Sequence, residues 1–198
     1  GAPAGWAIRA LRRRLCLSQG TAMKYFTPEL FIRGNSADAR QVRGVEEEWE
    51  QALRRYERRW RKIKATFPEA LRRFDESTVR LHDAEVLHLA REDQRFVMVL
   101  QPEIPAQNLV ILMFTLTKDP VILTEALPDA VRTQRRLWLY EEFDRDRHNQ
   151  FHFEVLLSNG WIVQLSFRDF QFLAGETIVS TTNGQTGRLT KTTATRSV

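Results

Sequence analysis

Cysteine is almost absent from this chain, which has a single one, Cys16, among its 198 residues. One thiol excludes both an intramolecular disulfide and a zinc centre built on several cysteines. Proteins of a reducing compartment commonly show this composition, so the sequence favours a cytoplasmic location.

Long apolar runs are also missing. The longest covers residues 109–116; it is interrupted by Thr115 and gives way to Asp119 and Pro120. A membrane-spanning helix needs about 20 apolar residues. The run therefore predicts a buried strand, and we expect a small soluble protein with no membrane partner.

The motifs of nucleotide-binding and hydrolytic enzymes are absent. The nine glycines are scattered, and none has the spacing of a phosphate-binding loop or a dinucleotide-binding turn. The sequence contains neither a G-x-S-x-G elbow nor an H-E-x-x-H zinc motif. We therefore expect no cofactor, and the sequence favours a protein that is not an enzyme.

Acidic residues are missing from the first 22 positions, which hold four arginines. The last segment, residues 176–198, holds three basic residues and one acidic residue. Between these ends the chain has 23 basic and 24 acidic residues, so the net charge of +5 belongs to the ends. The overall charge is then weak evidence for a nucleic-acid partner.

Composition divides the chain into three parts. Residues 1–22, rich in Ala and Arg, predict a disordered or non-native extension with Met23 as the natural start; an organellar presequence is the alternative. Residues 23–175 predict a single α+β domain. Residues 176–198 are rich in Thr and Ser and predict a disordered tail, because they contain too few large apolar side chains to order themselves.

The strongest periodic pattern is an amphipathic helix over residues 38–67. Its acidic residues lie near the start and its basic residues near the end, an order that complements the helix dipole. Apolar residues spaced three or four apart form one face: Val45, Trp49, Ala52, Tyr56, Trp60, Ile63 and Phe67.

Strand patterns begin near residue 78. The pair Asn159-Gly160, between two β-rich runs, predicts a hairpin with a two-residue type I′ turn. Such a loop pairs Leu157 with Ile162, and it leaves neither face of the hairpin clearly polar. We therefore expect both faces to be covered. Further strands are predicted over 86–90, 95–101, 109–117 and 121–123.

The fold class that follows is α+β, with a long N-terminal amphipathic helix packed on an antiparallel sheet of about four to six strands. Residues 125–147 are charged and predict a connection, with a helical turn near 137–143.

Histidine residues are the candidates for acid–base chemistry. A catalytic site could be drawn from two histidines near a carboxylate in one segment and a third beside a glutamate in the hairpin: His82, Asp83, His88, His152 and Glu154. Ordinary surface histidines are the competing interpretation, and no spacing here predicts a metal site.

Two other surfaces are candidates for binding. Aromatic residues in the charged connection, Trp138, Tyr140 and Phe143, could anchor a partner protein. The basic half of the long helix could contact nucleic acid through Arg54, Arg58, Arg61 and Lys62. Charge runs on helices are more often only solvated surface, so nucleic acid is the less favoured partner.

The body of the chain resembles a family of uncharacterised bacterial proteins over about residues 23–173. The resemblance lies in the segments MKYFTPEL, EWEQAL, LHDAEV, LSNGW and FRDF, which begin at Met23, Glu48, Leu81, Leu157 and Phe167. It implies a shared hydrophobic framework and supports Met23 as the start, and it implies no activity.

Three functional hypotheses remain. The first is a non-enzymatic protein-interaction domain of the inhibitor or immunity type, which binds another protein or a second copy of itself. The second is a metal-dependent or acid–base enzyme that uses His82, Asp83, His88 and His152. The third is a nucleic-acid binder that uses the basic half of the long helix.

Overall fold

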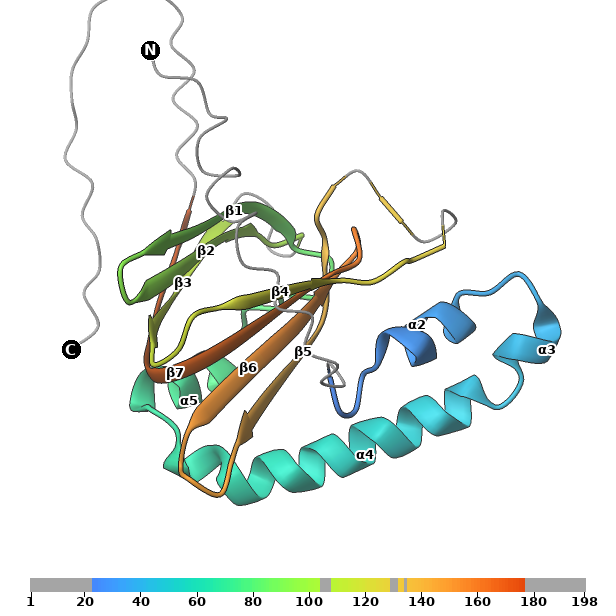
Figure 1. Ribbon diagram of the computed structural model, residues 1–198, viewed down its shortest axis with the longest axis horizontal. Helices are drawn as coiled ribbons and strands as arrows, with labels where there is room; N and C mark the ends of the chain where they lie inside the picture. Colours follow the sequence, from blue (N-terminus) through green and yellow to red (C-terminus); the bar gives the residue numbers. More distant parts are fainter. Residues whose placement is uncertain (1–22, 104–107, 129–131, 134, 177–198) are drawn as a thin grey trace, which may run out of the picture.

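The computed structural model describes residues 23–103, 108–128, 132–133 and 135–176 (Figure 1). The predictions for residues 1–22 and 177–198 lie outside the described residues. In these described residues, four α-helices and a 3-10 turn precede the strands: α2 (Pro28–Gly34), α3 (Ala39–Val42), α4 (Val45–Ile63), η1 (Lys64–Thr66) and α5 (Glu69–Glu76). The strands are β1 (Glu85–Glu92), β2 (Arg95–Gln101), β3 (Asn108–Leu116), β4 (Val121–Thr124), β5 (Trp138–Arg145), β6 (Phe151–Leu157) and β7 (Trp161–Glu176).

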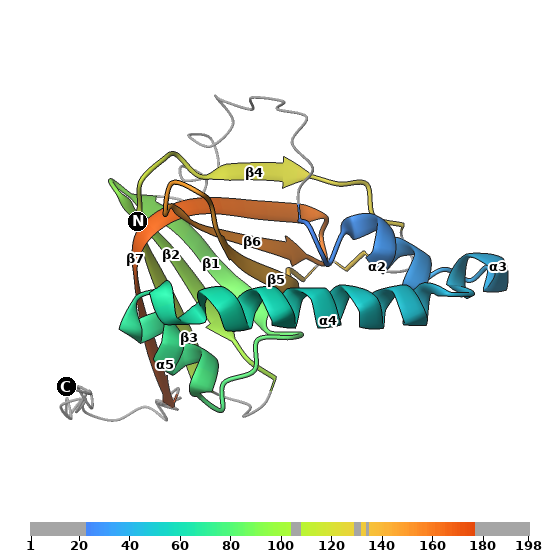
Figure 2. The same ribbon diagram turned by 90° about the horizontal axis from the view of Figure 1, so that it is seen from below.

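The strands form one antiparallel sheet in the order β1-β2-β3-β7-β6-β5. Strand β7 is long enough to pair with β4 and β6 through its first half and with β3 through its second. The sheet curls until its outer strands meet, where Asp83 donates its N–H to the Trp138 carbonyl (2.8 Å) and Val86 donates to Arg136 (2.7 Å). Figure 2 shows α4 along β5 and α5 beside β7.

The α+β class and the antiparallel sheet are confirmed, but two details of the fold prediction are wrong. The described sheet has seven strands rather than four to six. The long N-terminal helix over 38–67 is replaced by α3, α4 and η1, and α4, with 19 residues, follows two shorter helices. Gly44, with a φ of 83°, adopts the left-handed conformation that separates α3 from α4.

The expected helical turn near 137–143 is also wrong, because residues 138–143 belong to strand β5 and Leu137 forms an isolated bridge with Glu85. Their side chains alternate between the two faces of the sheet after a bulge between Trp138 and Tyr140. Pairing with β6 along the whole of β5 decides this conformation, and that pairing is a tertiary contact that local sequence does not encode.

The hairpin between β6 and β7 forms, but with a register one residue away from the expected one. Leu156 pairs with Ile162 and Val155 with Val163, which leaves a longer loop than the expected two residues. Gly160, the loop's positive-φ residue, donates its N–H to the Leu157 carbonyl, as in a type I turn followed by a left-handed glycine.

This shift sorts the side chains of the hairpin into two distinct faces. One face is apolar, with Phe153 opposite Leu165 and Val155 opposite Val163, all at most 2% exposed. The other face carries His152 opposite Ser166. The same face also carries Leu156 opposite Ile162, both 0% exposed, so neither face is clearly polar and both are partly covered, as expected. The one-residue slip changes only which side chains of the two strands share a face.

Two hydrophobic clusters lie on the two sides of the sheet. The first joins the apolar hairpin face to α5 and to the end of α4. The second joins residues 23–31 and the first half of α4 to Leu139, Leu156 and Ile162. In the part of the chain that is described, no helix has the length and apolar character needed to cross a membrane.

Candidate functional site

Strand β5 is the sheet edge nearest α4. Its first residue, Trp138, bonds to the backbone of Asp83 and Ala84, and beyond it the described contacts to the outer backbone of β5 come from side chains. The Phe143 N–H donates to the Tyr56 hydroxyl (2.9 Å), and Arg59 donates to the Arg145 carbonyl (2.5 Å). His82 Nδ1 lies 2.7 Å from the Leu139 carbonyl and donates to it. These contacts fix the distance between helix and strand, and they protect an edge that could otherwise pair with another chain.

A cavity of about 330 Å³ lies between α4, α5, residues 79–82 and β5, and we call it the aromatic pocket. Polar groups reach it from Asp75, Arg80, His82 and Glu141. Its aromatic lining comes from three different elements, namely Tyr56 and Trp60 of α4, Phe74 of α5, and Tyr140 and Phe143 of β5.

Glu141 is the carboxyl group on the wall of this pocket. Its Oε2 accepts a hydrogen bond from the indole N–H of Trp138 at 2.7 Å. Burial raises the pKa of Glu141 above its usual range, while the Trp138 hydrogen bond and the charge of His82 act in the opposite direction. Glu141 therefore takes up a proton more readily than a surface glutamate does.

The two tyrosines of the pocket stay neutral at physiological pH. Burial raises the pKa of Tyr56, and the hydrogen bond from Phe143 only partly opposes this effect. Burial, followed by the charge of Asp83, raises the pKa of Tyr140 as well. Neutral phenols among apolar rings can donate hydrogen bonds without adding charge.

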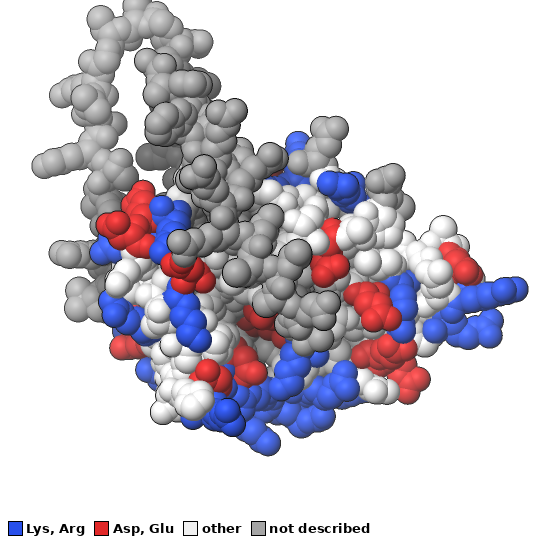
Figure 3. Space-filling view, viewed as in Figure 1, with Lys and Arg blue, Asp and Glu red and all other residues white. Residues whose placement is uncertain are grey.

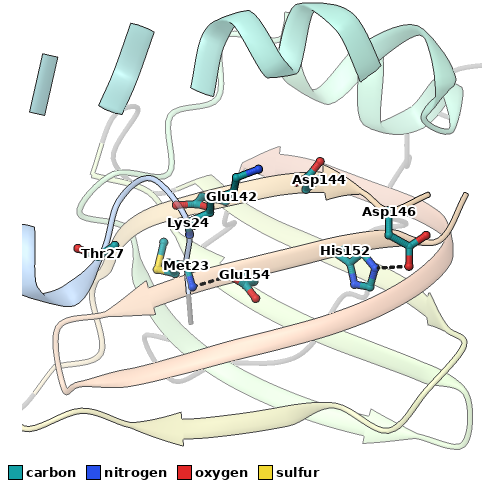
Figure 4. A pocket seen from close by; sticks show the side chains of 8 residues that line it. All are labelled: Met23, Lys24, Thr27, Glu142, Asp144, Asp146, His152 and Glu154. Atoms are coloured by element: carbon teal, nitrogen blue, oxygen red, sulfur yellow. Dashed lines mark hydrogen bonds and ion pairs between the residues drawn. The ribbon is translucent and has the colours of Figure 1, made fainter. Parts of the chain in front are cut away.

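A second cavity, of about 540 Å³, lies on the polar face of β5 and β6, and we call it the acidic groove (Figure 4). Its carboxylates are Glu142, Asp144, Asp146 and Glu154, and Lys24 and His152 also line it. The observed register creates it by placing Glu142 opposite Glu154 and Asp144 opposite His152.

Two of these carboxylates hold the chain that leads into α2. Glu142 accepts the N–H groups of Lys24 (2.9 Å), Tyr25 (2.7 Å) and Phe26 (2.7 Å). Glu154 accepts the Met23 N–H (2.7 Å). Burial raises the pKa of both glutamates above the usual range, and these backbone hydrogen bonds oppose only part of that rise. The pair thus attaches residues 23–26 to the sheet.

Further along the same face, three side chains form a chain of hydrogen bonds. Ser166 Oγ lies 3.3 Å from His152 Nδ1, and His152 Nε2 lies 3.2 Å from Asp146 Oδ2. Asp146 also accepts the N–H groups of Gln150 and His148 through Oδ1. The Gln150 N–H and the contact with His152 lower the pKa of Asp146 to about 2, so its carboxylate is ionised at neutral pH.

The structure places the five catalytic candidates at three separate positions. His82 and Asp83 lie together, with 3.6 Å between Nε2 and Oδ2, and His82 lines the aromatic pocket. His88 is exposed on β1. His152 and Glu154 line the acidic groove. Within the described ranges, no group of three His, Cys, Asp or Glu side chains is arranged to hold a metal ion.

The aromatic candidates for partner binding lie mostly inside the protein. Trp138 and Phe143 belong to the core, with 1% and 7% of their surface exposed. Tyr140 is half-buried and packs against Trp49, with 4.5 Å between ring centres. These three residues therefore offer no protruding aromatic anchor.

The basic candidates lie on the exposed side of α4, where Figure 3 shows Lys and Arg side chains gathered along the helix. Arg54 is paired with Glu50 at 2.9 Å and Arg61 with Glu57 at 3.5 Å. Arg58 and Lys62 are also exposed. Acidic neighbours one helical turn away thus offset part of the positive charge that a polyanion would meet.

The sequence pattern did not indicate a functional role for Glu141, Tyr56, Asp146 or Ser166. Glu141 was assigned to a helical turn, and Tyr56 was counted only as part of an apolar stripe. Ser166 lies opposite His152 only if the hairpin loop has three residues, 158–160. That register also places two apolar side chains, Phe153 and Leu165, opposite each other, and this pairing could have indicated it.

No protein family, curated protein or solved structure matches this chain. The resemblance to a family of uncharacterised bacterial proteins therefore stays an expectation, and a functional proposal has to come from the two cavities.

Proposed function

We propose that this protein binds a small organic ligand in the aromatic pocket. The ligand has an aromatic ring and an amine or other N–H group directed at Glu141. The observation that carries this proposal is the position of the Glu141 carboxyl on the wall of a cavity formed by aromatic side chains.

The size and lining of the cavity agree with ligand binding. Small-molecule sites commonly measure about 300–1,000 Å³ and combine apolar walls with a few polar groups. The aromatic pocket, at about 330 Å³, is at the lower end of that range and suits a ligand with one or two rings. Offset stacking against Trp60 or Tyr140 would add to the affinity.

Glu141 gives the pocket its chemical preference. Placing a carboxyl among apolar groups costs free energy unless a partner compensates, and among the described residues Trp138 is the side chain that donates a hydrogen bond to Glu141. A ligand amine would supply a further donor and, with Glu141 ionised, an opposite charge. Cationic amines also interact favourably with the faces of aromatic rings.

The test is a titration with matched ligands. Benzylamine, tryptamine and related aromatic amines would be compared with carboxylic acids of the same ring size, with the heat of binding measured by isothermal titration calorimetry as the signal. We expect saturable binding of amines that weakens at least tenfold in Glu141→Gln and is unchanged in Asp144→Asn, a control in the acidic groove. Equal binding by Glu141→Gln, or a preference for the acids, would contradict the proposal.

A second candidate function is the protein-interaction domain that the sequence favours. Its support is strand β4, which pairs with β7 on one side and, in the described part of the chain, with no strand on the other. Val121, Ile122 and Leu123 are partly exposed there. A free strand edge can accept a strand from another chain.

Sedimentation distinguishes this candidate from a ligand-binding monomer. If β4 mediates self-association, the wild-type protein sediments as an oligomer and Ile122→Lys shifts it to the monomer. A wild-type protein that is monomeric at high concentration, with the same sedimentation as Ile122→Lys, would remove the support for self-association.

A further inference from the structure

The hydrogen-bonded chain on the polar face of the sheet has a defined direction. Asp146 is ionised and can only accept, so His152 Nε2 donates the hydrogen bond between them. Neutral imidazole then has an unprotonated Nδ1. Ser166 therefore donates its hydroxyl proton to His152 Nδ1, across a distance of 3.3 Å.

Each member is held in place by the fold. Cross-strand pairing sets His152 opposite Ser166. Asp146 lies in the loop between β5 and β6, where two backbone N–H groups orient its carboxylate. The serine, the base and the carboxylate that orients the base are the groups that activate a hydroxyl nucleophile in unrelated enzymes.

The relay is accessible from solvent. His152 and Asp146 line the acidic groove, and about a third of each side chain is exposed. Ser166 lies on the same face, one strand away, and is partly exposed. Figure 4 shows His152 and Asp146 at one end of the groove and residues 23–27 at the other, so a small molecule can approach the relay.

We propose that Ser166 is a nucleophile, activated by His152 and positioned through Asp146, that accepts acyl groups from small neutral or cationic esters. This site is independent of the aromatic pocket. The carboxylates of the groove, Glu142, Asp144 and Glu154, disfavour anionic esters, because like charges would meet in a partly buried cavity.

The acyl transfer balances without a cofactor. Ser166 Oγ forms a bond to the ester carbonyl carbon while its proton moves to His152 Nδ1. The ester C–O bond then breaks, and the departing oxygen takes that proton. Water repeats the two steps on the acyl-serine, which releases a carboxylic acid and restores Ser166.

The rate enhancement of acyl transfer is limited by the backbone groups around Ser166. The Ser166 carbonyl accepts the Thr117 N–H, and β7 is paired with β6 on one side and with β3 on the other. The backbone N–H groups of the sheet are therefore engaged in its hydrogen bonds rather than directed at the oxyanion that forms during acyl transfer. General-base catalysis alone contributes roughly 10²–10⁴-fold, and we expect an enhancement in that range.

The test measures acetylation of Ser166 by p-nitrophenyl acetate in the full chain, with the modified peptide located by mass spectrometry. We expect Ser166 to be the fastest-acetylated serine, and His152→Ala to slow its acetylation at least 100-fold. His88→Ala, which removes an exposed histidine on β1, should leave the rate unchanged. Acetylation of other serines at the same rate, or an unchanged rate in His152→Ala, would overturn the proposal.

Two further variants separate activation from structural damage. Ser166→Cys should react with iodoacetamide faster when His152 is present than when it is replaced by alanine. Asp146→Asn should lower the acetylation rate, while Asp146→Glu restores part of it. A thiol at position 166 that reacts independently of His152 would show that the relay does not activate this position.

Discussion

Replacing Glu142 by alanine removes the group that attaches residues 24–26 to the sheet. Its carboxylate is 5% exposed and accepts three backbone N–H groups at 2.7–2.9 Å. A buried N–H without a partner costs roughly 1–3 kcal/mol. Loss of the buried charge offsets part of that cost, so we expect Glu142→Ala to lower the free energy of unfolding by about 3 kcal/mol.

For a chain of this length, 1 kcal/mol corresponds to roughly 2–4 °C in Tm, so Tm should fall by about 6–12 °C. Circular dichroism measures the transition, and amide hydrogen exchange at Tyr25 and Phe26 reports on the attachment itself. The matched control for the amide exchange is Glu141→Ala, on the opposite face, because Glu141 accepts the Trp138 indole N–H and no N–H group of residues 23–26.

Either of two results would contradict this role of Glu142. One is a Glu142→Ala protein whose unfolding free energy lies within about 0.5 kcal/mol of the wild-type value, the usual range for a surface substitution. The other is unchanged exchange at Tyr25 and Phe26, which would mean that the carboxylate does not protect these amides.

Three further predictions concern stability. Because the pKa of Glu141 is raised, the folded protein holds the proton of this carboxyl more tightly than the unfolded chain does. The protonated carboxyl therefore stabilises the fold fully below pH 4.5, and this stabilisation is lost as the pH rises through the folded-state pKa. Glu141→Gln should therefore stabilise the protein at pH 7 but not at pH 4, as urea unfolding at both values would test; equal effects would contradict the shift. Gly160→Ala should cost more than about 2 kcal/mol, because the residue has a φ of 84° and its Cβ would overlap the Glu125 carbonyl oxygen. Gly44→Ala, with a φ of 83° and open space around it, should cost only about 1–2 kcal/mol, and equal losses would remove the steric argument. Tyr56→Phe should cost roughly 1–3 kcal/mol in thermal unfolding, because it leaves the Phe143 N–H without its acceptor; an unchanged Tm would show that another group replaces the hydroxyl.

Periodicity located most elements of the fold. The stripe from Val45 to Phe67 predicted a helix over 38–67 that contains α4, because apolar spacing of three and four residues directly reports a helix that is buried on one side. The break at Gly44 was missed because a glycine's effect depends on its φ, which tertiary structure selects. The Asn159-Gly160 pair fits two hairpin loops, and only the match of apolar residues across the strands distinguishes them.

The candidate sites were harder to predict than the fold. Glu141 and Tyr56 meet because α4 packs along β5, a contact between residues 85 positions apart. His152 was noticed as a histidine, but its partners Asp146 and Ser166 depend on a loop conformation and on the strand register. Residue types thus indicated single candidate residues, but which of them lie close enough to act together depends on the three-dimensional structure.

The most direct test of the ligand-binding proposal is a crystal structure of the protein soaked with the tightest-binding aromatic amine. The proposal predicts electron density between α4, α5 and β5, with the ring against Trp60 or Tyr140 and the amine within hydrogen-bond distance of Glu141. Density in the acidic groove instead, or an aromatic pocket closed by its own side chains, would contradict it.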